Sequence, residues 1–147
     1  MGALPSDYRI LVIDDEIPVL EVMTDILAGV GWSVDAYRSP LEALTHVKGG
    51  RYDALVLDLY MQELSGLLVY AHVSFLDHEL ASRTVFVSGH LTSEDLARAL
   101  CATPRFLPKP FRAEALTGMV GMALPDTPRR LTAGLASDRR DGTSSRS

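Results

Sequence analysis

Short apolar runs alternate with stretches of helical periodicity along most of the chain. The run RILVI at 9–13 is rich in β-branched residues and is typical of a strand that is buried on both faces. Pro18 then suits the first turn of a helix, and apolar side chains recur every three or four residues after it, at Val19, Leu20, Met23, Ile26, Leu27 and Val30. This pattern predicts one buried strand followed by one amphipathic helix.

The same pattern repeats four more times. Further strands are predicted over 33–37, 53–58, 84–87 and 105–107. A capping box at 39–42 begins a helix that runs to about Lys48, and further helices are predicted over 67–76, 92–100 and about 112–124. Five strands that alternate with five helices predict an α/β fold, in which helices cover both faces of a parallel sheet.

The composition changes after residue 125. Nine of the 22 residues from 126 to 147 are Ser, Thr or Gly, and the only large apolar residues there are Leu131 and Leu135. So little apolar surface cannot offset the entropy cost of ordering the chain. We therefore expect a folded domain over 8–124 and a disordered tail over 125–147. Because this tail is too short for an effector domain, we expect the output to lie in another protein.

Charge and cysteine content restrict the class of protein. The whole chain carries −5, but residues 1–125 carry −7, which argues against nucleic acid or an anionic membrane as the main partner. The single cysteine, Cys101, excludes an internal disulfide and fits a reducing compartment. No stretch has the pattern of a signal peptide or the length of a membrane span. We expect a cytoplasmic protein without membrane insertion.

Acidic side chains follow the predicted strands at the points where they end. Asp14 and Asp15 come directly after the first strand, and Asp58 ends the third. The carboxyl ends of parallel strands meet at one edge of a sheet, so these three carboxylates converge. Like charges so close together repel one another and require a cation among them, and Mg²⁺ prefers such oxygen ligands. The sequence therefore predicts a Mg²⁺ site.

Two more polar groups reach the same edge. Ser88 follows the fourth strand, and Lys109 follows the fifth, between Pro108 and Pro110. Carboxylates, a cation, a hydroxyl and an ammonium group together can hold a phosphoryl group. Asp58 is the candidate nucleophile, as carboxylates are in aspartyl-phosphate chemistry.

Four segments resemble, in order, the signature of the receiver domain of two-component response regulators. They are RILVIDDE at 9–16, VLD at 56–58, VSG at 87–89 and KPF at 109–111. The resemblance covers about residues 8–124 and is to the stand-alone, chemotaxis-regulator-like type. It implies a flavodoxin-like three-layer sandwich whose strand order is 2-1-3-4-5.

The resemblance also implies roles for the matched residues. Asp58 would take a phosphoryl group from a phosphohistidine of a sensor histidine kinase or a histidine phosphotransfer protein. Asp15, Asp58 and the backbone carbonyl of Tyr60 would bind Mg²⁺, and Asp14 would act largely through water. Lys109 would pair with the phosphoryl oxygens. The chain is then a signalling phosphoacceptor and not an enzyme, and it assists only its own phosphorylation and dephosphorylation.

A switch follows from the same resemblance. Ser88 would donate a hydrogen bond to the phosphoryl group, and Phe106 would move inward. The movement would alter the surface of the helix at 92–100, the fifth strand and the last helix, where a downstream effector protein binds.

Some positions depart from the usual receiver pattern. Many receivers have proline where this chain has Gln62, a change that removes no reacting group. Phe106 stands where tyrosine is commoner, so that its inward position depends on packing alone. Tyr60 and His90 are bulky neighbours of Asp58. Such positions tune dephosphorylation within the family, and one hypothesis is that these two side chains screen the attacking water.

Two functions from other classes remain open. A small Mg²⁺-dependent phosphohydrolase would also use Asp58 as its nucleophile. Haloacid-dehalogenase-like enzymes, however, place a second aspartate two residues later, where this chain has Tyr60. A receiver-like interaction protein would act without phosphorylation, although such a scaffold has no physical need for carboxylates that repel one another.

Overall fold

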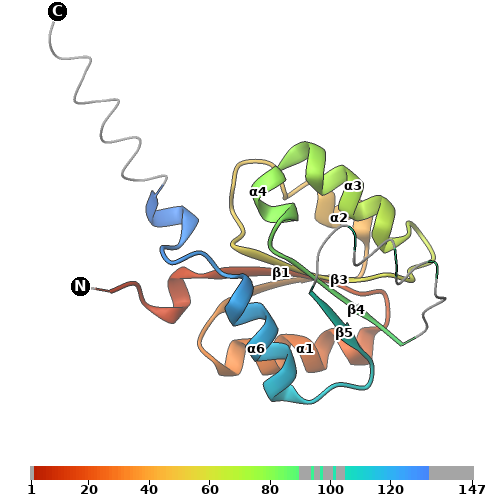
Figure 1. Cartoon of the computed structure of the whole chain (residues 1–147), viewed down its shortest axis with the longest axis horizontal. Helices are drawn as coiled ribbons and strands as arrows, with labels where there is room; N and C mark the ends of the chain where they lie inside the picture. The colour runs from red at the N-terminus through yellow and green to blue at the C-terminus, as the bar shows by residue number, and fades with distance from the viewer. Residues whose placement is uncertain (1, 90–93, 95–96, 98–100, 102–104, 133–147) are drawn as a thin grey trace, which may run out of the picture.

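Five parallel strands form one sheet in the order β2-β1-β3-β4-β5 (Figure 1). The strands are β1 (Arg9–Ile13), β2 (Ser33–Tyr37), β3 (Ala54–Asp58), β4 (Thr84–Ser88) and β5 (Phe106–Pro108). The computed structural model describes residues 2–89, 94, 97, 101 and 105–132 of the chain. Both the parallel sheet and its strand order are confirmed.

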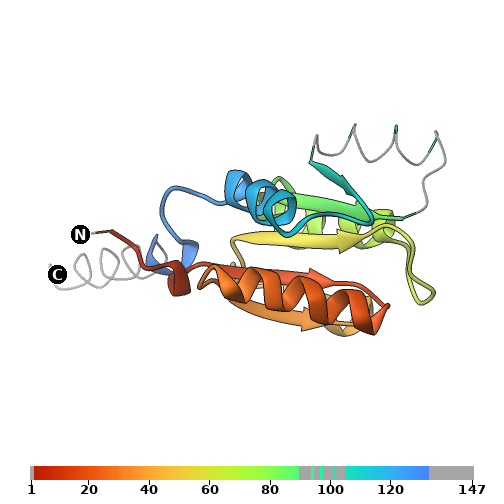
Figure 2. The same cartoon turned by 90° about the horizontal axis from the view of Figure 1, so that it is seen from below.

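Helices cover both faces of the sheet (Figures 1 and 2). One face carries α1 (Ile17–Gly29) and α6 (Ala113–Ala123), and the other carries α2 (Pro40–Leu44), α3 (Gly66–Leu76) and α4 (His78–Ala81). A 3₁₀ turn, η1 (Pro5–Asp7), precedes β1. The predicted three-layer α/β fold is confirmed, while the helix predicted over 92–100 falls almost entirely outside the described residues. In the described part of the chain, no helix has the length and apolar character to cross a bilayer.

The two faces of the sheet form two separate cores. Side chains of successive strand residues point to opposite faces, so a strand that is covered on both sides needs apolar residues throughout. In β1, Ile10 and Val12 pack into the core beneath α1 and α6, while Leu11 and Ile13 pack into the core on the α2, α3 and α4 face. This double burial fixes the ends of β1 and β3 and thereby the position of the residues that follow them.

Two observed helices differ from the prediction. The helix after β2 is predicted to reach about Lys48, but α2 ends at Leu44, and the N–H groups of 45–47 donate to carbonyls three residues earlier. The chain therefore continues in tighter turns of the 3₁₀ type. The short helix α4 is absent from the prediction. It forms because Asp77 interrupts the helical periodicity after α3 and accepts a hydrogen bond from the N–H of Leu80.

Residues 125–132 lie against the edge of the sheet at which the strands begin, where a disordered tail is predicted. Pro128 is buried, and the backbone over 129–132 is helical. The Tyr8 hydroxyl lies 2.9 Å from the carbonyl oxygen of Pro125 and 2.8 Å from that of Asp126. Polar contacts, which composition does not reveal, hold this segment. The rest of the predicted tail, 133–147, lies outside the described residues.

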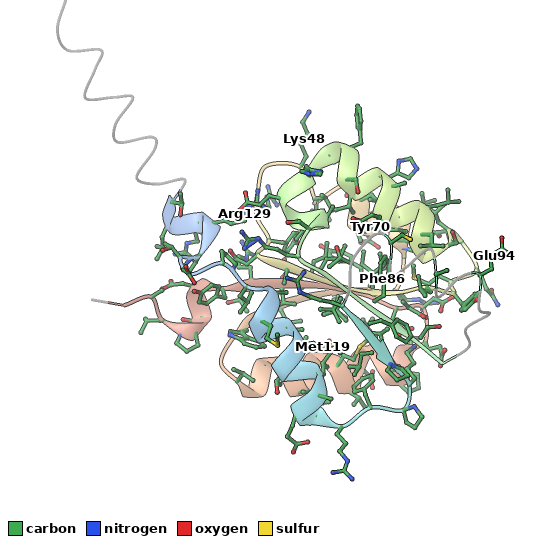
Figure 3. All side chains as sticks on the ribbon, in the orientation of Figure 1. Lys48, Tyr70, Phe86, Glu94, Met119 and Arg129 are labelled. Carbon is green, nitrogen blue, oxygen red and sulfur yellow. The ribbon has the colours of Figure 1, made fainter. Side chains whose placement is uncertain are left out.

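Arg129 anchors the segment (Figure 3). Its guanidinium donates to both carboxylate oxygens of Asp77, at 2.7 and 3.1 Å, and to the carbonyl oxygen of Tyr52 at 2.9 Å. Its backbone N–H donates to Asp53 Oδ1 at 2.8 Å. The side chains of Arg129 and Asp77 are only 16% and 7% exposed, so water screens the pair weakly.

Replacing Arg129 with alanine is expected to lower the free energy of unfolding by about 2 kcal/mol, because it leaves the Asp77 carboxylate buried without its partner. Arg130→Ala, at the exposed neighbouring position, is the control and should change this free energy by less than about 0.5 kcal/mol. Urea unfolding measures both variants. Equal effects would show that the Arg129 contacts do not stabilise the fold.

Candidate functional site

Two buried carboxylates lie at the carboxyl ends of neighbouring strands. Because β1 pairs in parallel with β3, with Ile13 opposite Leu57, Asp14 and Asp58 come to the same edge of the sheet. Asp14 is 0% exposed and Asp58 is 2% exposed. The sequence prediction that these two carboxylates converge is confirmed.

Lys109 brings a positive charge to this edge. Its Nζ lies 2.7 Å from Asp14 Oδ2, 3.5 Å from Asp58 Oδ2 and 3.9 Å from Glu16 Oε1. Its backbone N–H donates to the carbonyl of Ser88, which holds the chain after β5 beside the end of β4. Burial disfavours the ammonium, but the three carboxylates outweigh this effect and raise the pKa of Lys109. Lys109 is therefore charged in the folded protein.

The single ammonium group does not fully compensate the carboxylates. Burial, followed by the negative charge of Asp14, raises the pKa of Asp58 from 3.8 to about 7, against the opposing effects of Lys109 and of the Tyr60 backbone N–H. That N–H lies 3.3 Å from Asp58 Oδ1. Without a further cation, Asp58 is close to half-protonated near neutral pH.

Apart from Asp15, the structure describes three of the other four predicted site residues. Ser88 is the last residue of β4 and is buried, while Tyr60 is exposed beside Asp58. Phe106 begins β5 opposite Phe86 and packs, half-buried, against the core on the α3 face. Figure 3 shows Tyr70 of α3 and Phe86 of β4 in that same part of the core. His90 lies outside the described residues.

The sequence predicts that Asp15 converges with Asp14 and Asp58, but the structure does not bring its carboxylate into their group. In the described part of the chain, the acidic group whose oxygens all lie within 4.8 Å of one another consists of Asp14, Glu16 and Asp58. The Asp15 carboxylate instead accepts a hydrogen bond from the backbone N–H of Gln62 at 3.0 Å. Asp15 is half-buried beside the loop between β3 and α3.

Two contributors to the site are absent from the sequence prediction. Glu16 enters the acidic group because its backbone N–H donates to Asp14 Oδ1 at 2.9 Å, which turns the chain back toward the site. The signal for it was its place directly after Asp14 and Asp15 in the RILVIDDE segment. The sequence contains no signal for the hydrogen bond from the Gln62 N–H, because every residue except proline has this group.

The arrangement of donors fits a hard divalent cation. The side chains of Asp14, Glu16 and Asp58 offer carboxylate oxygens only, and Lys109 supplies one positive charge against three negative ones. Oxygen ligands and excess negative charge are what Mg²⁺ sites in proteins provide. A bound cation would oppose the effects of burial and of the Asp14 charge, and so lower the pKa of Asp58.

Comparison of the sequence with known proteins finds response regulators. The model of the response regulator receiver domain family matches residues 10–121. Response regulator protein TodT from Pseudomonas putida is 32% identical over 122 residues, which cover 82% of this chain and 53% of that protein. Response regulator MprA from Mycobacterium avium is 36% identical over 108 residues, which cover 74% of this chain and 47% of that one. The chain spans about half the length of these relatives.

Solved structures share the fold. A CheY-like receiver domain protein from Methanospirillum hungatei superposes with a TM-score of 0.72 at 20% identity, covering 78% of this chain and 91% of that one. Chemotaxis protein CheY4 from Vibrio cholerae has the same TM-score and identity, covering 80% and 98%. At this identity the likeness supports the fold alone.

The raised pKa of Asp58 makes stability depend on pH in the metal-free protein. Between pH 3.8 and about 7 the folded protein keeps a proton on Asp58 that the unfolded chain releases. The stabilisation that this proton provides is fully present below pH 3.8 and is lost as the pH rises through about 7. Asp58→Asn leaves an uncharged side chain at position 58 at every pH. The free energy of unfolding of this variant, relative to that of wild type, should therefore grow with pH in this window, by at most about 1.4 kcal/mol per pH unit.

Urea unfolding with a chelator present, from about pH 5 to about pH 8, measures this difference. Asp25→Asn, which removes an exposed carboxylate on α1, is the control. A pH dependence of Asp58→Asn no larger than that of the control would contradict the raised pKa of Asp58.

Proposed function

This chain belongs to the response regulator receiver domain family, and on that basis we propose that Asp58 accepts a phosphoryl group from a phosphohistidine of a sensor kinase or phosphotransfer protein. The observation that carries the proposal is the buried arrangement of Asp58, Asp14 and Lys109 at the end of β3. Receiver domains are signalling phosphoacceptors, and we propose that this one assists only its own phosphorylation and dephosphorylation.

The residues present fit the Mg²⁺ ion that this chemistry uses. We assign Asp15, Asp58 and the Tyr60 carbonyl as its ligands, with Asp14 acting through water. The fit rests on the carboxylate oxygens of Asp14, Glu16 and Asp58 and on their uncompensated charge, while the assignment of Asp15 rests on the family resemblance. When bound, the ion shields negative charge as the carboxylate and the phosphoryl group approach each other. It also favours the ionised form of Asp58, which is the nucleophilic form.

The transfer forms one bond and breaks another. An oxygen of the Asp58 carboxylate donates an electron pair to the phosphorus atom, while the phosphorus–nitrogen bond of the phosphohistidine breaks and its electron pair stays on the imidazole nitrogen. The product is an acyl phosphate on Asp58. Lys109, whose Nζ lies 3.5 Å from Asp58 Oδ2, pairs with the phosphoryl oxygens and stabilises the charge on them.

The switch connects this chemistry to a surface. In the proposal, the Ser88 hydroxyl donates to the phosphoryl group, and Phe106 moves further into the core against which it already packs in part. Because phenylalanine has no hydroxyl, packing alone favours its inward position. The surface that changes consists of β5, α6 and the predicted helix at 92–100, and we propose that a downstream effector protein binds there.

Incubation with Mg²⁺ and a small acyl phosphate is expected to add one phosphoryl group to the wild-type protein and none to Asp58→Ala. Intact-mass spectrometry under conditions that preserve the acyl phosphate measures the addition. Asp25→Asn, which changes an exposed aspartate on α1, should be modified like wild type. Modification of Asp58→Ala to the wild-type extent would contradict the assignment of the acceptor.

Ser88→Ala should still accept the phosphoryl group but lose most of the conformational response, because no hydroxyl remains to bind the phosphoryl oxygen. The response is measured as the change in backbone amide chemical shifts of β5 and α6 after phosphorylation. Ser88→Thr keeps a hydroxyl and should retain the response. A wild-type pattern of shifts in phosphorylated Ser88→Ala would remove Ser88 from the switch.

A further inference from the structure

Helix α3 is apolar on its outer side as well as on the side that packs into the core. On the outer side, Leu68 is 53%, Phe75 is 90% and Leu76 is 38% exposed. A surface helix of a globular protein normally turns polar side chains to water. The exposed residues recur at the spacing of successive helical turns and so lie along one face. This outer face of α3 consists of Leu68, Ala71, His72, Phe75 and Leu76.

The charge on the helices distinguishes α3 from the others. Among the helices that the structure describes, each of the other α-helices carries at least one carboxylate and neither Lys nor Arg, whereas α3 has no Asp, Glu, Lys or Arg. Two copies of the chain that met through the same one of those other helices would bring like charges together, at a cost in free energy. Two copies that meet through α3 bring none together. In a chain whose net charge is −5, this favours a second copy as the occupant of the outer face.

Charges of opposite sign lie at the two ends of this layer of helices. Glu63 is exposed just before α3 begins, while Lys48 and His78 are exposed where α2 and α3 have ended. Gly49 and Glu79, the chain neighbours of these two cationic residues, line one cavity, which places Lys48 and His78 at the same end. Glu79 itself already pairs with two arginines. Figure 3 shows the Lys48 side chain pointing outward there. An antiparallel pair of α3 helices places the acidic end of one copy against the basic end of the other.

The exposed apolar area is sufficient for a weak dimer. Phe75 alone exposes about 200 Å², the area that an aromatic side chain buries in a core. The neighbouring helix α2 adds Leu41, which is 55% exposed. A patch of this kind amounts to roughly 500 Å² per copy, so two copies bury about 1,000 Å² in total, the lower limit for a specific interface. We therefore expect a dissociation constant on the order of 100 µM.

We propose that the outer face of α3 binds the same face of a second copy of this chain, with the two helices antiparallel about a two-fold axis. In such an interface both copies use the same surface. Ala71 is the middle residue of α3, so the axis passes close to it, and its small side chain lets the two helices approach closely. The inference does not rest on the proposed function, because no residue of the outer face belongs to the Asp58 site.

The first test introduces a charge into the outer face. Phe75→Asp places a carboxylate in the apolar contact and faces a second carboxylate across the axis, so dimerisation should weaken by about tenfold or more. Met122→Asp is the matched control, because Met122 is 83% exposed on α6, on the other face of the sheet. This control should dimerise like wild type.

Sedimentation equilibrium over protein concentrations from about 10 µM to about 1 mM measures the dissociation constants of all three proteins. A wild-type protein that remains monomeric at the highest concentration would overturn the inference. A loss of dimerisation in Met122→Asp equal to that in Phe75→Asp would overturn it as well, since the contact would then not lie specifically on α3.

A cross-linking experiment decides the question if Phe75→Asp does not fold. Ala71→Cys should form a disulfide-linked dimer under mild oxidation, because residues at the two-fold axis bring their Cα atoms within the span of a disulfide, about 4–7 Å. Cys101 is exposed, so the experiment uses a Cys101→Ser background. Asp25→Cys, at an exposed position on α1, is the control and should remain largely unlinked. Equal yields of linked dimer from the two cysteine variants, or none from Ala71→Cys, would overturn the inference.

Discussion

The burial of two like charges side by side is the constraint on which the rest of the structure depends. Asp14 and Asp58 lie together because β1 and β3 pair in parallel, and at this depth water screens their repulsion weakly. Lys109 reaches both of them because β5 runs parallel to β4 and brings the chain that follows it to the same edge. The strand order therefore decides which charges meet. Burial, together with the negative charge of Asp14 that Lys109 does not fully compensate, raises the pKa of Asp58, and the excess negative charge favours a cation at this edge.

Much of the fold follows from the sequence because burial on both faces demands apolar residues at every strand position. In β1, consecutive apolar residues fill two different cores, and the shortness of the run and its β-branched residues favour a strand over a buried helix. The placement of 125–132 could not be predicted in this way. Arg129 and Asp77 are 52 residues apart, and the ion pairs of Arg129 with Asp77 and Glu79 change neither the periodicity nor the local composition. Contacts of this kind become visible only when the chain is folded.

The site also has features that the sequence predicts and features that it does not. The ends of strands are visible in sequence, so Asp14, Asp58 and Lys109 could be assigned to one edge before their distances were known. Asp15 could also be assigned there, but its hydrogen bond could not, because the Gln62 N–H that donates to it is a main-chain group. Sequence thus predicts which side chains gather, and the backbone decides how each one is presented.

The segment anchored by Arg129 lies where the strands begin, and Asp58 lies where they end. A strand of five residues spans about 16 Å, so a rigid sheet separates the two poles of the molecule. Residue 132, the last described residue, lies at the pole opposite the acceptor. Chain joined to the domain at this pole is compatible with unchanged chemistry at Asp58, at the opposite pole. This separation gives the domain the geometry of an exchangeable module.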